Sequence, residues 1–223
     1  MAGFDGPCEW IEPFIERLGE PRAFWLRKPR PVGERILVGG RRGFVPGTAG
    51  DRVVILLHPK TAFGTGGHGT TEGCLVALEK TIRGGESVLD VGTGTGILAI
   101  AARKLGAGRV TAIDIDRKAC REARENLALN GIGEGIDLVC GGVDSVKGAF
   151  DIVVANLRTG ALVALAEDLF RRMNRQGIAI FSGILERESH SILRFFESRP
   201  QTIQETIWFH GWMTLVLAAV RRS

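Results

Sequence analysis

The stretch SVLDVGTGTGILAIAARKLGAGRVTAID, from Ser87 to Asp114, decides the fold of this chain of 223 residues. It begins with a short apolar run over 87–91, which predicts a buried parallel strand. The glycines of GTGTG (92–96) allow a sharp turn, and the apolar, Ala-rich run 97–105 predicts a helix. A second strand is predicted over 109–113. The stretch is therefore a strand, a glycine loop, a helix and a second strand in succession.

An acidic residue at the end of the second strand indicates which kind of ligand this unit binds. Asp114 follows Gly92 by 22 positions, as the two residue numbers show. A carboxylate at that place can accept hydrogen bonds from both hydroxyl groups of a ribose, while the glycine loop lets the backbone approach a ligand closely. The unit therefore predicts a nucleoside-binding site.

The spacing of the loop favours one nucleoside over another. The dinucleotide pattern G-x-G-x-x-G needs glycine or alanine where this chain has Ile97. Asp90, two residues before Gly92, would repel a pyrophosphate but can face a cation. S-adenosylmethionine carries an adenosine, a sulfonium cation and an amino group, and it has no phosphate. It is the predicted cofactor, and NAD is the alternative.

Composition sets outer limits on the class of protein. Hydrophobic residues make up 44% of the chain and charged residues 24%, which is ordinary for a globular protein with one main domain. No apolar run approaches the roughly 20 residues that cross a bilayer, so no membrane contact is expected. The cysteines form no C-x-x-C pair, which predicts a reducing cytoplasm and no metal site. They are Cys8, Cys74, Cys120 and Cys140.

The net charge of the first fifty residues changes from negative to positive along the sequence. Residues 1–20 are acidic, with apolar side chains at helical spacing, and predict a short amphipathic helix. The segment Arg22–Arg42 is basic, and its prolines predict extended or irregular chain. It is either a docking surface for RNA or an acidic protein, or a solvated basic loop.

A loop rich in glycine and threonine precedes the central unit. Residues 52–58 predict a strand, and the following loop, 59–71, is a candidate lid over the nucleoside. Phe63 either stacks on adenine or fills the core. His68 is either a catalytic base or, more commonly for a loop histidine, a structural residue. Thr70 or Thr71 is expected to cap a helix over 72–80.

Helical and strand patterns alternate regularly after Asp114. Strands are predicted over 137–140, 150–155, 177–184, 203–210 and 213–220, and helices over 117–130, 162–173 and 186–198. The last two strands form a hairpin around Gly211. This order predicts a seven-stranded, mostly parallel sheet with an antiparallel last strand and helices on both faces. Asp114 and Asn156 then lie at strand ends in one crevice. Asp144 either contacts adenine or is an exposed loop acid.

This arrangement resembles the class I adenosylmethionine-dependent methyltransferases, whose Rossmann-like sheet ends in an antiparallel strand. Four blocks resemble one family within that class, the bacterial methyltransferase of large-ribosomal-subunit protein eleven. They are AFGTGGHGTT (62–71), LDVGTGTGILAIAARKLGA (89–107), IDID (113–116) and VVANLRTG (153–160). The resemblance implies a methyltransferase domain over residues 51–223, preceded by a short N-terminal appendage over 1–50 that is a reduced substrate-recognition region.

The resemblance implies cofactor contacts at Thr71, Gly92, Asp114 and Asn156, and the chemistry of the residues around them extends this set. Asn156 and the backbone carbonyl of Leu157 are expected to orient an acceptor amine. The expected cofactor contacts are Phe63, Gly64, Thr65, Thr71, Asp90, Gly92, Gly94, Gly96, Asp114, Ile115 and Asn156.

The implied reaction is transfer of a methyl group from S-adenosylmethionine to a lysine or N-terminal amine of a protein, most simply a ribosomal protein. Three departures from the family pattern bear on the substrate: Gly67 and Gly69 flank His68, Arg158 follows Leu157, and about fifty residues stand where the family has a full recognition domain. The alternatives are a relative with another protein substrate, a non-catalytic adenosylmethionine-binding protein, or an NAD-dependent oxidoreductase.

Overall fold

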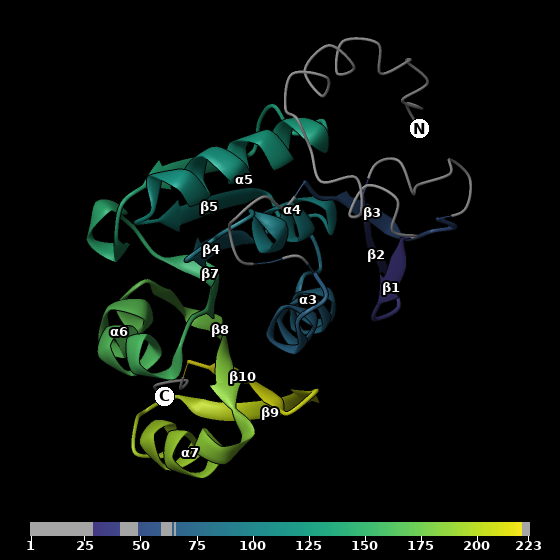
Figure 1. The fold of residues 1–223 in the computed structure, drawn as a ribbon. Helices are drawn as coiled ribbons and strands as arrows, with labels where there is room; N and C mark the ends of the chain where they lie inside the picture. The colour runs from purple at the N-terminus through teal and green to yellow at the C-terminus, as the bar shows by residue number, and fades with distance from the viewer. Residues whose placement is uncertain (1–28, 41–48, 59–63, 65, 220–223) are drawn as a thin grey trace.

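The computed structural model describes residues 29–40, 49–58, 64 and 66–219. The amphipathic helix predicted over 1–20 lies outside these residues. The described chain forms one large sheet with helices on both faces and a separate small sheet (Figure 1). No helix within these ranges is long and apolar enough to cross a membrane.

The large sheet has seven strands in the order β6-β5-β4-β7-β8-β10-β9. Its first five strands in that order run parallel, and β10 runs antiparallel to both β8 and β9. The predicted mostly parallel sheet with an antiparallel last strand is therefore confirmed. The strands are β4 (Ser87–Val91), β5 (Arg109–Asp114), β6 (Ile136–Cys140), β7 (Phe150–Asn156), β8 (Met173–Leu185), β9 (Thr202–Phe209) and β10 (Trp212–Ala218).

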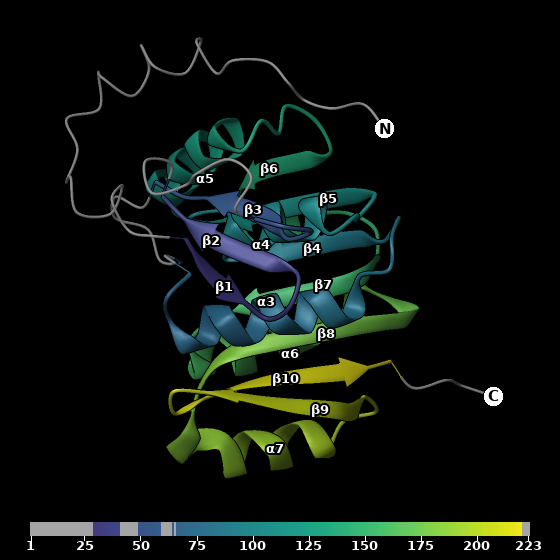
Figure 2. The same ribbon diagram turned by 90° about the vertical axis from the view of Figure 1, so that its right-hand side faces the viewer.

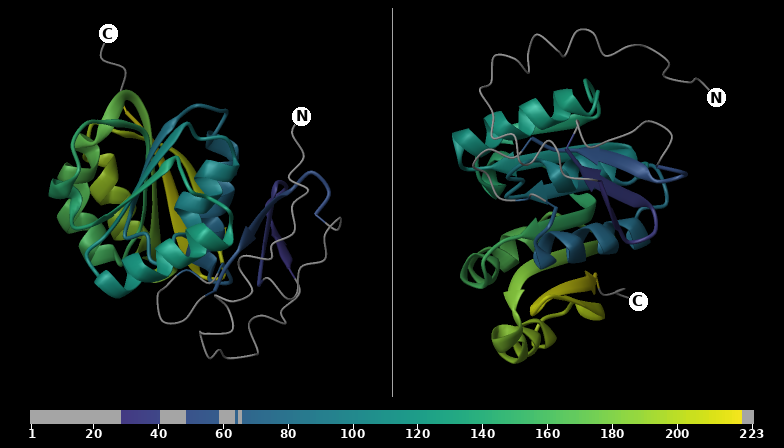
Figure 3. Two further views of the ribbon diagram at one scale, coloured as in Figure 1. Left: turned by 90° about the horizontal axis from the view of Figure 1, so that it is seen from above. Right: turned by 45° about the vertical axis from the view of Figure 1, so that its right-hand side comes forward.

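Helices cover both faces of this sheet, as the view from above in Figure 3 shows. Helices α3 and α4 pack on one face, where α5 contacts α4, and α6 and α7 pack on the other. The helices are α3 (Gly69–Thr81), α4 (Ile97–Lys104), α5 (Arg117–Leu129), α6 (Thr159–Arg171) and α7 (Ser189–Glu197), with short 3-10 turns η2 (Val143–Ser145) and η3 (Glu186–Glu188).

Each central strand contributes to two hydrophobic cores. Val88 packs in the core on the α3 and α4 face, and its neighbour Leu89 packs in the core on the α6 and α7 face. Both are fully buried, because successive side chains of a strand point to opposite faces and both faces are covered. This explains why the central strands read as continuous apolar runs rather than alternating ones.

The small sheet has the order β1-β2-β3 and lies beside α3 and α4 (Figure 2). Its strands are β1 (Arg30–Val32), β2 (Ile36–Gly39) and β3 (Val53–Leu56). Two of them fall in a segment whose prolines predicted extended or irregular chain. Pro31 is compatible with β1 because this strand is an edge strand, which needs hydrogen bonds on one side only. The domain boundary at residue 50 stays a prediction; β3, beyond it, pairs with β2, before it.

Three element boundaries differ from the sequence prediction because of contacts that the local pattern does not show. Helix α3 begins at Gly69, because His68 rather than a threonine caps it: Nδ1 of His68 accepts from the Thr70 N–H. Strand β8 begins at Met173, four residues early, because it continues along β7 until Met173 pairs with Phe150. Helix α6 correspondingly ends at Arg171.

Candidate functional site

Because β4, β5 and β7 are aligned in register, the predicted site residues Gly92, Asp114 and Asn156 lie next to one another at the same edge of the sheet. Val91 pairs with Ile113 on one side and with Ala155 on the other. The next residue of each strand or loop is Gly92, Asp114 and Asn156 respectively. From β4 the chain continues to β5 and β6 on one side, and β7 and β8 lie on the other. This is the point of an open sheet where ligands bind.

The glycine loop is held against the end of β5. The N–H groups of Gly92 and Thr93 both donate to the carbonyl of Ile113 at 2.9 Å. Gly92 has a φ of +71°, and a Cβ there would lie 2.5 Å from Cδ2 of Leu157. Only glycine adopts this conformation easily and leaves room for Leu157 to cover the turn. The side chain of Leu157, just after β7, therefore packs directly on the backbone of the glycine turn.

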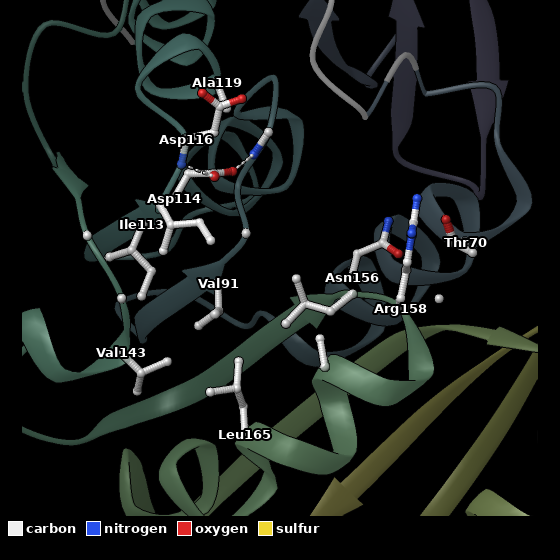
Figure 4. A pocket seen from close by; sticks show the side chains of 18 of the residues that line it. Thr70, Val91, Ile113, Asp114, Asp116, Ala119, Val143, Asn156, Arg158 and Leu165 are labelled. Atoms are coloured by element: carbon white, nitrogen blue, oxygen red, sulfur yellow. Dashed lines mark hydrogen bonds between the residues drawn. The ribbon is translucent and has the colours of Figure 1, made fainter.

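Asp114 has a carboxylate that the backbone orients. Its Oδ2 accepts from the Gly94 N–H and its Oδ1 from the Asp116 N–H, both at 2.9 Å (Figure 4). Each oxygen keeps further acceptor capacity, because a carboxylate has about four lone-pair sites. The next residue, Ile115, is 82% exposed, which is unusual for a large aliphatic side chain. The end of β5 thus presents two acceptors and an uncovered apolar surface.

Asp90 lies behind the loop rather than in it. It is fully buried, and its Oδ2 accepts from Oγ1 of Thr93 at 2.6 Å and from the Ala99 N–H at 3.1 Å. These bonds tie β4 to the loop and to the first turn of α4. Burial raises the pKa of Asp90 to about 7, and the Thr93 and Ala99 bonds oppose this shift.

This raised pKa predicts how stability depends on pH. The pKa of Asp90 in the folded chain exceeds the unfolded value of about 3.9, so between them the native state holds more protons. Stability is therefore lost as pH rises through this window. From about pH 5 to pH 8 we expect Asp90 to remove roughly 2 kcal/mol, and Asp90→Asn to flatten that slope. Urea unfolding at both pH values measures it.

A matched control separates this effect from a general loss of charge. Hydrogen bonds from Ser87 and Asn174 lower the pKa of Asp151 against its partial burial. Its contribution therefore changes only below its ordinary pKa. Asp151→Asn should keep the wild-type slope above about pH 5. Equal slopes in wild type and Asp90→Asn would show that Asp90 is ionised throughout this range.

The site opens into a cavity of about 600 Å³. Its walls come from the ends of β4, β5, β6, β7, β8 and β10 and from the starts of α3, α5 and α6, and Figure 4 shows many of these side chains. Most lining groups are apolar side chains or glycines, with a few polar groups between them. This is the composition of a pocket for a small organic ligand.

The structure places part of the predicted site in this cavity. The lining includes Gly92, Gly94, Asp114, Ile115, Asn156 and Leu157. Four predicted residues do not line it: Asp90, Gly96, Gly64 and Thr71. Of these, Gly64 accepts from Oγ1 of Thr95 and so fastens the preceding loop to the glycine turn. Phe63 and Thr65 lie outside the described residues. Asp144 is exposed and borders a separate, smaller hollow.

Two buried oxygens of the predicted site have no hydrogen-bond partner among the described residues. They are Oγ1 of Thr71 and Oδ1 of Asp90, both predicted cofactor contacts. Buried polar atoms are almost always satisfied, so each of these atoms has capacity for a partner that the described residues do not supply. Such capacity fits a cofactor that brings its own polar groups, including an ammonium.

Sequence reasoning missed the wall made by β10 and the start of α3. Trp212 lines the cavity, and its ring lies 4.8 Å from that of His68, centroid to centroid. His68 also caps α3 and contacts Oγ1 of Thr70 at 2.9 Å, which gives it the structural role. Trp212 is 144 positions from His68, as the two numbers show, and only the antiparallel pairing of β10 with β8 brings them together. No local pattern indicates that contact.

Comparison with known proteins agrees with this geometry. The family model described as ribosomal protein L11 methyltransferase (PrmA) matches residues 24–219. A relative of that name from Pelobacter propionicus is 36% identical over 98% of this chain and 79% of its own length. One from Caldicellulosiruptor saccharolyticus is 40% identical over 85% of this chain, which spans only 62% of that protein.

A solved structure supports the same assignment. The crystal structure of ribosomal protein L11 methylase from Lactobacillus delbrueckii subsp. bulgaricus superposes with a TM-score of 0.80 at 32% identity. The match covers 86% of this chain and 99% of that one. The fold, the cavity at the strand ends and these relatives agree: this chain belongs to the ribosomal protein L11 methyltransferase family.

Proposed function

We propose that this protein transfers a methyl group from S-adenosylmethionine to an amine of a protein. The observation that carries the proposal is the shared level of Gly92, Asp114 and Asn156 on one cavity. A ribosomal protein is the proposed substrate, since the relatives are named for ribosomal protein L11. The acceptor is a lysine or an N-terminal amine.

The β5 side of the cavity fits an adenosine. The oriented carboxylate of Asp114 would accept the two ribose hydroxyls, and Ile115 and Val143 would cover the base. Among the described lining residues no lysine or arginine stands at the glycine turn, where a pyrophosphate would need one. The buried Asp90 behind that turn disfavours phosphate further. These features favour S-adenosylmethionine over NAD.

The β7 side supplies the groups that an acceptor amine needs. S-adenosylmethionine, when bound, supplies a methyl group made electrophilic by its sulfonium. Asn156, as the last residue of β7, can accept a hydrogen bond from the amine and so point the nitrogen lone pair at that methyl. The carbonyl of Leu157 is a second acceptor. The amine must arrive uncharged, and no dedicated general base is required.

The basic segment Arg22–Arg42 is proposed to help dock an RNA or an acidic surface of the substrate. Much of it lies outside the described residues. Within the described part, Arg30 pairs with Glu72 of α3 at 2.5 Å and also donates to the carbonyl of Gly66. Arg30 therefore fastens the small sheet to the loop before α3, and other cations of the segment would serve in docking.

Thermal unfolding with three ligands tests the cofactor. S-adenosylmethionine and S-adenosylhomocysteine should raise the midpoint and NAD should not, because only a ligand of the folded state stabilises it. A screen of ribosomal and cytosolic proteins with radiolabelled methyl donor then tests transfer. A shift with NAD alone would refute the proposal. A shift with the adenosyl ligands but no labelled protein would favour a non-catalytic binding protein.

Replacing Asn156 by alanine should separate turnover from cofactor binding. We expect kcat to fall about tenfold, because the amine loses its orienting acceptor. The dissociation constant of S-adenosylhomocysteine, measured by calorimetry, should change much less. Equal losses in both quantities would contradict the orienting role of Asn156 and assign it to the cofactor.

A further inference from the structure

Arg158, the residue after Leu157, places a positive charge at the cavity, and the proposed methyl transfer assigns no role to it. Arg158 is exposed, lines the cavity, and stands directly before α6. In Figure 4 its side chain and that of Asn156 extend in the same direction, side by side in this view. Among the described residues the guanidinium has no hydrogen bond or ion pair. It is a cation on the acceptor side without a counter-ion in this part of the chain.

The acids that line the cavity are committed elsewhere. Asp114 ends β5 and Asp116 follows it, and β4 separates β5 from β7 in the sheet. The carboxylate of Asp114 accepts two backbone N–H groups, and that of Asp116 accepts the N–H of Lys118 to cap α5. Neither carboxylate is on β7 or in the segment that joins β7 to α6, which contains Arg158.

The acids close to the start of α6 and α3 are also occupied. Glu188 accepts from Oγ1 of Thr159 at 2.6 Å, and Glu72 pairs with Arg30. The wall facing Asn156 is made of His68, Thr70, Gly183 and Trp212, none of which is an acid. Helix α6 has no side-chain cap, so its N-terminal N–H groups add to the positive potential. The start of α6 therefore adds to the positive charge of Arg158 on this side of the cavity.

We propose that Arg158 determines acceptor specificity by binding a carboxylate that the substrate carries next to the methylated amine. This inference rests on the proposed function and narrows its substrate to an amine flanked by acidic residues. A guanidinium presents N–H groups in a planar fork that matches a carboxylate, so one substrate carboxylate would satisfy it. The same cation repels an ammonium and favours entry of the uncharged amine that methyl transfer needs.

Short peptides test this inference on the full chain loaded with S-adenosylhomocysteine. Three blocked peptides carry one lysine flanked on both sides by glutamate, glutamine or lysine. Calorimetry measures their binding, and kcat/KM with S-adenosylmethionine measures their methylation. We expect the glutamate peptide to be preferred over the glutamine peptide by about tenfold, as a charge-assisted hydrogen bond gives. The lysine-flanked peptide should be the poorest.

Substitutions of Arg158 should change this order without unfolding the protein, because the side chain is exposed. Arg158→Gln should remove the preference for glutamate, Arg158→Lys should keep part of it, and Arg158→Glu should reverse it in favour of the lysine-flanked peptide. Arg175, an exposed cation at the opposite end of β8, provides the control. Arg175→Gln should leave the order of the three peptides unchanged.

Two results would overturn the inference. The first is an equal response of wild type and Arg158→Gln to all three peptides, in binding and in methylation. The second is weaker binding of S-adenosylhomocysteine to Arg158→Gln with unchanged binding of methylthioadenosine, which lacks the carboxylate; Arg158 would then bind the cofactor. Failure of the proposed function looks different, because selective peptide binding would persist with no methyl transfer to any acceptor.

Discussion

Gly183→Ala is expected to lower the free energy of unfolding by about 3–5 kcal/mol. Gly183 has a φ of +89°, and a Cβ there would lie 1.9 Å from the carbonyl oxygen of Leu157. Alanine therefore adds a strained backbone to a clash with the backbone of the residue beside Asn156. Backbone atoms cannot rotate away, so β7 and β8 must separate at the cavity. Urea unfolding of the purified variant measures the loss.

Alanine substitutions at two other glycines separate the cost of backbone strain from the cost of the steric clash at Gly183. Gly131 has a φ of +69°, but a Cβ there would meet nothing within 4 Å, so Gly131→Ala should cost only about 1–2 kcal/mol. At Gly160, in the first turn of α6, a Cβ likewise meets nothing and φ is not positive. Gly160→Ala should stabilise by about 0.5–1 kcal/mol. A Gly183→Ala loss no larger than that of Gly131→Ala would show that Leu157 moves freely.

Asp114→Ala is expected to weaken the binding of S-adenosylhomocysteine by about 1.5–3 kcal/mol, or roughly tenfold to a hundredfold. The substitution removes both predicted acceptors for the ribose. It also releases the N–H groups of Gly94 and Asp116, which the carboxylate holds at 2.9 Å. The loop should therefore lose order along with the direct contact. Calorimetry at constant salt gives the dissociation constants.

Asp144 supplies the comparison for this measurement. It is exposed and lies outside the main cavity, and the sequence allowed either an adenine contact or an exposed loop acid there. Asp144→Ala should leave the affinity unchanged. An unchanged affinity in Asp114→Ala would remove that residue from the site, and a loss in Asp144→Ala would move the adenine toward η2.

The central unit could be predicted because its determinants are local. The strand Ser87–Val91, the glycine turn and the helix after it follow one another in the sequence, and the turn between them needs positive φ angles that glycine adopts easily. Asp114 was found from its spacing to Gly92, since a strand, a loop and a helix have nearly fixed lengths. Asn156 required only the further rule that parallel strands end at one edge.

The rest of the site depends on contacts between distant segments. His68 caps α3 in place of a threonine, and its ring meets Trp212 from the far end of the chain. The small sheet forms because β2 pairs with β3 across an intervening segment. The turn between β1 and β2 is held by Glu79 of α3, whose carboxylate accepts hydrogen bonds from the N–H groups of Glu34 and Arg35. Neither event leaves a periodic signal in the sequence.

Because β4 and β7 are neighbours in the sheet, the proposed cofactor contacts and the proposed acceptor contacts lie on opposite sides of the boundary between these two strands. Residues proposed to hold the nucleoside lie at or after the ends of β4, β5 and β6. Those on the acceptor side lie at the end of β7, near the end of β8 and at the start of β10. Mutations on the second side can therefore retune which amine is accepted while the nucleoside contacts stay intact. Under the proposed function, a substitution at Arg158 would change the accepted amine and leave the contacts to the methyl donor in place. The choice of acceptor can therefore change independently of the binding of the methyl donor.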